Sequence, residues 1–172
     1  MLNRRTFLKT GLLGALALAA GGALYRTVQG AVPPGRYVLD GEARAVLAAI
    51  VPAIVGPMLP DEAAARAAAV VRTTDGVQQA IASLPLGTQK EVRDLFGLLA
   101  LAPARRFLAG VPAWSDTTPE QAAAFLQGWR THRLEMLQTA YHALHDLVLG
   151  AWYADPASWA ATGYPGPIKE LN

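Results

Sequence analysis

Apolar residues in the second half of the chain recur every three or four positions, and this spacing is the strongest constraint on its fold. From Thr118 to Tyr153 no proline follows position 119, and the apolar positions are Leu134, Leu137, Tyr141, Leu144, Val148 and Trp152. Such spacing places one apolar face along a helix. No segment shows sustained alternation of apolar and polar residues, so no sheet is expected. We therefore predict an all-α fold, a single compact helical bundle domain.

Signals in the first half of that domain predict two helices. Asp40 is expected to cap a helix that Pro52 kinks or ends, because proline lacks the amide donor and its ring meets a carbonyl of the preceding turn. Asp61 is expected to cap an alanine-rich helix that reaches about Leu84, with a break near Thr74–Gly76.

Further helix boundaries are predicted in the second half. Thr88 to Glu91 has the sequence of a capping box, and Thr118 to Gln121 has a second one with proline at the first helical position. A break near Gly128–His132 divides the long apolar stretch. Asp155-Pro156 is expected to start a last short helix, and Gly163 to end it as a left-handed residue.

The first thirty residues have the order of an export signal. A cationic start is followed by fifteen uncharged residues from Thr10 to Leu24, fewer than the roughly 20 needed to span a bilayer. The start resembles the twin-arginine translocation signal at Arg4, Arg5, Phe7, Leu8 and Lys9. That resemblance implies export in the folded state, through the twin-arginine translocase, to the periplasm. A general secretory signal and an uncleaved signal are the alternatives.

These features predict three segments. Residues 1–30 form the signal segment, with a signal helix, and residues 31–39 form an exposed linker around Pro33-Pro34-Gly35. Residues 40–172 form the helical domain.

Charge and composition exclude several classes of function. Four of the fifteen cations lie in the first thirty residues, and the other eleven are outnumbered by thirteen acidic residues, so nucleic-acid binding has little support. The chain has no cysteine, which excludes disulfides and thiolate chemistry. No nucleotide-binding glycine motif and no nucleophile motif occurs, so we expect a protein without catalytic residues, resident cofactor or metal.

Three histidines are the remaining candidates for chemistry. His132, His142 and His145 lie close to Glu135 and Asp146 in the same predicted helical region. We expect His142 to pair with Asp146 one turn away, His145 to lie beside Tyr141, and His132 to be solvated. The alternative is a small enzyme built on His142, His145 and Asp146.

The C-terminal tail gathers large aromatic residues among turn residues. Its candidate interface residues are Trp152, Tyr153, Trp159, Tyr164, Pro165, Gly166 and Pro167. One interpretation is a flap that closes the bundle. The other is an aromatic surface that docks a partner, since tryptophan and tyrosine are favoured interface anchors.

This tail resembles the C-terminus of the small subunit of bacterial membrane-bound gluconate, sorbitol and FAD-dependent glucose dehydrogenases. Leu47 to Pro52 resembles the first helix of that family, and the leader is similar as well. The resemblance implies a non-catalytic subunit that escorts a large, signal-less flavoprotein of the glucose–methanol–choline type. FAD is then expected in that partner, and a cytochrome c subunit commonly accepts the electrons.

Two other classes of function stay open. A stand-alone periplasmic binding protein would use the apolar interior of the bundle as its pocket. A membrane-tethered structural protein would keep its signal and stay attached to the inner membrane.

Overall fold

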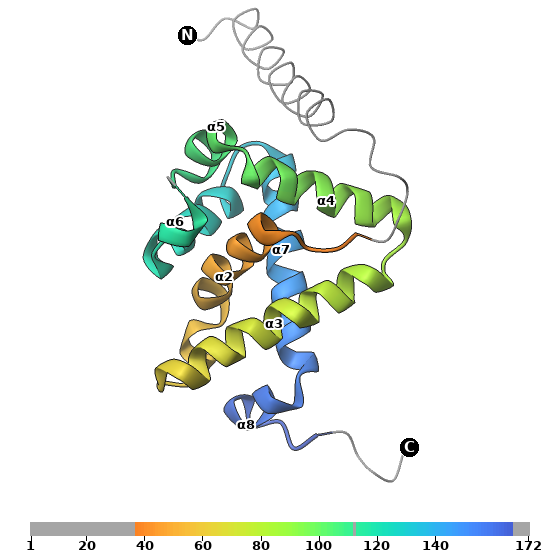
Figure 1. The fold of residues 1–172 in the computed structure, drawn as a ribbon. Coiled ribbons are helices and arrows are strands. Elements are labelled where there is room, and N and C mark those ends of the chain that lie inside the picture. Colours follow the sequence, from red (N-terminus) through yellow and green to blue (C-terminus); the bar gives the residue numbers. More distant parts are fainter. Residues whose placement is uncertain (1–36, 112, 167–172) are drawn as a thin grey trace, which may run out of the picture. The chain divides into compact units, whose positions relative to one another are not determined.

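The described part of the chain folds around one apolar helix that other helices surround (Figure 1). The structure, a computed structural model, describes residues 37–111 and 113–166. Its helices are α2 (Gly41–Val55), α3 (Ala63–Ser83), α4 (Leu86–Ala100), α5 (Ala102–Ala104), α6 (Pro119–Arg130), α7 (Glu135–Ala154) and α8 (Trp159–Thr162). Short turns join them: η1 (Gly56–Met58), η2 (Arg105–Ala109), η3 (Trp114–Asp116) and η4 (Pro156–Ser158). The described residues contain no strand, so the predicted all-α fold is confirmed.

Helix α2 is the centre of the bundle. It contacts α3, α4, α6 and α7, and its buried face includes Val46, Leu47, Ile50, Val51 and Val55. Among the described residues, Gly41–Met58 is the one helical stretch long and apolar enough to cross a membrane. A core helix of a soluble domain meets the same criterion, and the contacts of α2 on several sides account for its apolar composition.

Local capping sets several helix ends as expected. The Asp40 carboxylate accepts a hydrogen bond of 2.8 Å from the backbone N–H of Ala43. Thr118 and Gln121 form a reciprocal capping box at the start of α6. Helices α6 and α7 are separate, which confirms the predicted break near Gly128–His132.

Other predicted boundaries were wrong. Helix α2 does not end at Pro52 but continues to Val55, and Glu62 caps α3 instead of Asp61. The capping box at Thr88 does not form, because α4 begins two residues earlier. Helix α3 also runs unbroken through Gly76, where a bare backbone lets α7 approach closely.

Residues 37–39 belong to the domain, which corrects the predicted exposed linker. Tyr37 and Leu39 are buried in the core. The Gln89 side chain accepts a hydrogen bond of 3.0 Å from the Tyr37 N–H, and the Gln78 side chain accepts one of 2.6 Å from the Leu39 N–H. Gln78 also donates to the Tyr37 carbonyl, so the segment is fixed through its backbone. Residues 31–36 lie outside the described part.

Candidate functional site

The C-terminal turn after α7 is held by hydrogen bonds to its backbone. Asp155 accepts a hydrogen bond of 3.0 Å from the Ala157 N–H, and Pro156 follows it at the first position of η4. The buried Ser158 hydroxyl lies 2.7 Å from the Trp152 carbonyl and 2.9 Å from the Asp155 carbonyl. Gly163, at φ 71°, ends α8 in the left-handed conformation, as predicted. The turn therefore has a defined conformation.

This turn presents an aromatic surface to solvent. The Trp159 indole N–H donates to the Tyr153 carbonyl at 3.0 Å, and the rings of Trp159 and Tyr164 meet edge to face at 5.2 Å. Tyr164 is 50% exposed and Trp159 is partly buried. Tyr153, at the end of α7, is 51% exposed, and its hydroxyl lies 3.9 Å from the Met58 sulfur. We call Tyr153, Trp159 and Tyr164 the C-terminal aromatic surface.

Gly166 fits closely against this surface. Its φ of 94° lies in a region that side chains rarely adopt, and a Cβ there would lie 3.1 Å from Cζ3 of Trp159. Pro165 is exposed beside it. Glycine and proline thus let the tail fold back over the Trp159 ring without a clash. Pro167, the last of the predicted interface residues, lies outside the described part, as do the predicted export-signal residues Arg4, Arg5, Phe7, Leu8 and Lys9.

Trp152 does not belong to the exposed surface, which corrects its predicted place at the interface. It is 3% exposed and lies in the core with Val148 and Leu144. The helical spacing of these residues in the sequence already indicates the buried face. The Trp152 carbonyl lies 2.7 Å from the Ser158 hydroxyl, and this contact connects Trp152 to the turn that carries Trp159.

The histidines do not gather around a common point. Asp146 approaches His145, with Nδ1 and Oδ1 3.4 Å apart, and does not pair with His142 as expected. His145 does lie beside Tyr141, at 5.4 Å between ring centres. His132 Nδ1 accepts a hydrogen bond of 3.1 Å from the Leu134 N–H, so it stabilises the turn between α6 and α7. Within residues 37–111 and 113–166, no three metal-ligating side chains come together.

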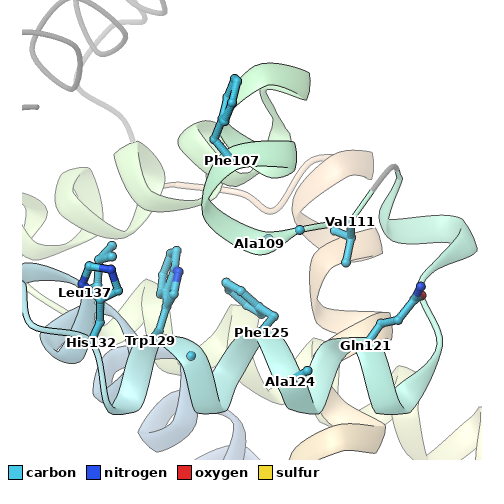
Figure 2. Close-up of a pocket in the computed structure, with 11 residues that line it drawn as sticks. Phe107, Ala109, Val111, Gln121, Ala124, Phe125, Trp129, His132 and Leu137 are labelled. Atoms are coloured by element: carbon cyan, nitrogen blue, oxygen red, sulfur yellow. The ribbon is translucent and has the colours of Figure 1, made fainter.

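A second surface, which the sequence analysis missed, is a groove between η2 and α6 (Figure 2). Its volume is about 440 Å³. Phe125 and Trp129 rise from α6 into the groove, and Gln121 and His132 mark its two ends (Figure 2). Phe125 and Trp129 are themselves buried, and small residues, including the exposed Gly128, lie beside them. The sequence shows that Phe125 and Trp129 are four residues apart, but it does not show that the segment η2 lies across the groove from them.

Phe107 projects from η2 at the edge of this groove. Its side chain is 89% exposed and points away from α6 (Figure 2). Only the surrounding structure could identify it, because an isolated phenylalanine in a sequence is expected in a core.

Comparisons with protein-family models, with curated proteins and with solved structures find no match. The C-terminal aromatic surface offers ordered, half-exposed rings, and the groove offers an apolar floor.

Proposed function

We propose that this chain is a non-catalytic small subunit of a periplasmic FAD-dependent dehydrogenase of the glucose–methanol–choline type. It escorts a flavoprotein that lacks its own signal through twin-arginine export and then stabilises the complex. The proposal takes its partner class from the resemblance of the tail and the leader to that family. FAD belongs to the partner, and a cytochrome c subunit is a further expected member of the complex.

The C-terminal aromatic surface is the observation that carries this proposal. Two tyrosines are half exposed although the backbone around them is ordered by Asp155, Ser158 and Gly163. Rigid aromatic side chains lose little conformational entropy on binding and bury a large area, which makes them efficient anchors in protein interfaces.

A flap that only closed the bundle would bury these rings more fully. Trp152 already lies in the core and is 3% exposed, so the fold does not need Tyr153 or Tyr164 as core residues. Their exposed area is available to a partner, and this favours the docking interpretation of the tail over the flap.

Stand-alone ligand binding is the second candidate, and the groove between η2 and α6 favours it. A volume of about 440 Å³ falls within the range of small-molecule sites. Its floor residues Phe125 and Trp129 are almost fully buried, however, so a ligand there would gain little new contact with them. The escort function uses more of the exposed apolar surface of this chain than ligand binding in the groove would.

Purification of a C-terminally tagged chain from its native host tests the proposal. We expect a larger protein to copurify and to show flavin absorption and fluorescence. In that case we expect only this chain, and not the larger protein, to carry an export signal. Sequencing of the two mature N-termini and of their genes tests this expectation.

The alternatives give different results in the same experiment. A stand-alone binding protein elutes alone with a small ligand. A small enzyme has activity by itself and loses it in His142→Ala. A membrane-tethered protein sediments with the inner membrane and retains residues 1–30. Any of these outcomes without a flavoprotein contradicts the escort function.

A further inference from the structure

Three exposed arginines lie in the two chain segments that include Phe107 and His132. Arg106 precedes Phe107 in η2, and Arg130 and Arg133 lie in and beside the turn between α6 and α7. The two segments are neighbours, because Phe107 and His132 line the same groove (Figure 2). Leu134, in the same turn, is also exposed. We call Arg106, Phe107, Arg130, Arg133 and Leu134 the cationic tip.

The cations of the tip have no acidic partner in the described part of the chain. Arg106, Arg130 and Arg133 form no ion pair there, in contrast to Arg44 and Arg72, which pair with aspartates at 2.9 and 3.0 Å. Glu135 is the one acidic residue in the segments 105–107 and 130–135. The tip is therefore a local excess of positive charge on a domain whose acidic residues outnumber its basic ones.

We propose that the cationic tip is a membrane-binding surface that takes the headgroups of an anionic phospholipid bilayer. In this arrangement the Phe107 ring enters the boundary between headgroups and acyl chains, and the guanidinium groups remain with the lipid phosphates. Cationic residues around an exposed apolar side chain are the usual composition of an interfacial anchor. This inference goes beyond the escort function and does not depend on the flavoprotein.

Charge complementarity selects the bilayer among the possible occupants. The chain's own leader is excluded, since Arg4, Arg5 and Lys9 give it the same sign of charge as the tip. A protein partner would need a pocket for one ring bordered by several carboxylates. An anionic bilayer presents phosphates at every position of the surface and accepts an apolar ring at any of them.

Binding of the full chain to lipid vesicles tests the proposal. Vesicles of phosphatidylcholine with phosphatidylglycerol are compared with vesicles of phosphatidylcholine alone by flotation. Because residues 1–30 are cationic and apolar themselves, the comparison is made between variants that share them. One variant combines Arg106→Gln, Arg130→Gln and Arg133→Gln, and the other is Phe107→Ser.

The matched control changes the same kinds of residue elsewhere. Leu86→Ser with Lys90→Gln removes one exposed apolar side chain and one exposed cation from the N-terminal part of α4, where Lys90 pairs with Asp94 at 2.8 Å. We expect the triple arginine variant to bind the anionic vesicles on the order of a hundredfold more weakly, and Phe107→Ser about tenfold. The control should bind about as the parent does, and salt should weaken the parent more than the triple variant.

Equal binding of the parent to both kinds of vesicle overturns the proposal, and so does an unchanged affinity in the two variants. A third result points to a protein occupant. If the variants keep their affinity for vesicles but lose the copurifying flavoprotein, the tip is a protein interface and the membrane assignment is wrong. Loss of vesicle binding with the flavoprotein retained supports the proposal even if the flavoprotein proves to be of another class.

Discussion

Helices α3 and α7 approach each other closely at Gly76, and this contact predicts a large effect of one added side chain. A Cβ at Gly76 would lie 3.1 Å from the Ala151 Cβ and 3.6 Å from its Cα and carbonyl oxygen. Two of those three atoms belong to the backbone of α7, so they cannot move without shifting the helix. Gly76→Val adds two further methyl groups into the same space.

The expected destabilisation follows from two opposing effects. Helix propensity alone would make valine a few tenths of a kcal/mol more favourable than glycine. Overpacking of a close contact costs about 1–3 kcal/mol, so the steric effect dominates. For a domain of this size that corresponds to a melting temperature lower by roughly 3–10 °C, measured by circular dichroism on the full chain.

Gly150→Val is the matched control, because Gly150 lies in α7 with nothing near the Cβ position. It should melt at or slightly above the temperature of the parent. Combining Gly76→Val with Ala151→Gly should recover part of the lost stability, since the second change removes the nearest atom. If Gly76→Val melts at the same temperature as Gly150→Val, the reasoning about this helix contact is refuted.

Trp152→Phe should change the unfolding free energy by about 1 kcal/mol or less, because the buried indole N–H has no acceptor among the described residues. Trp152→Ala should lower the unfolding free energy by about 3–5 kcal/mol. Urea unfolding measures both variants, and equal losses would contradict this prediction. Backbone hydrogen bonds from the first turn of α3 lower the pKa of Glu62, so its stabilising contribution is present at neutral pH and is lost as the pH falls through that lowered pKa. Glu62→Gln should therefore make stability less sensitive to acid, and an unchanged acid dependence counts against this cap. Under the proposed escort function, Arg4→Lys with Arg5→Lys should leave this chain and the proposed flavoprotein partner in the cytoplasm, and undiminished periplasmic dehydrogenase activity would contradict that proposal.

The helix ends that the sequence predicted are those set by local chemistry. Thr118 with Gln121, Asp155 with Pro156, and Gly163 each act on backbone groups within a few residues, so the residue type and spacing suffice. Their conformations were predicted without knowledge of the rest of the fold.

The boundaries that the sequence missed depend on distant contacts. Gln89 lies within the expected capping box at Thr88, but it is buried and its side chain binds the backbone of Tyr37 and Leu84. The low helix propensity of glycine predicted a break at Gly76. The structure instead shows that glycine at this position leaves room for the close contact with α7. Neither effect can be read from neighbouring residues.

The candidate surfaces also differ in whether neighbouring residues in the sequence are enough to predict them. Tyr153, Trp159 and Tyr164 were found because four large aromatic residues within a short tail are conspicuous in composition. The cationic tip was missed because Phe107 and Arg133 are far apart in the sequence, and only the fold makes their segments neighbours.

The most direct test of the proposed function measures flavoprotein affinity and thermal stability on one variant. Tyr164→Ser changes a half-exposed ring of the C-terminal aromatic surface, and Val71→Ser changes an exposed apolar residue of α3 as its control. We expect Tyr164→Ser to weaken association with the flavoprotein by at least about tenfold while it melts within a few degrees of the parent. Undiminished association, or a loss of association that Val71→Ser shares equally, would contradict the assignment of this surface to the partner.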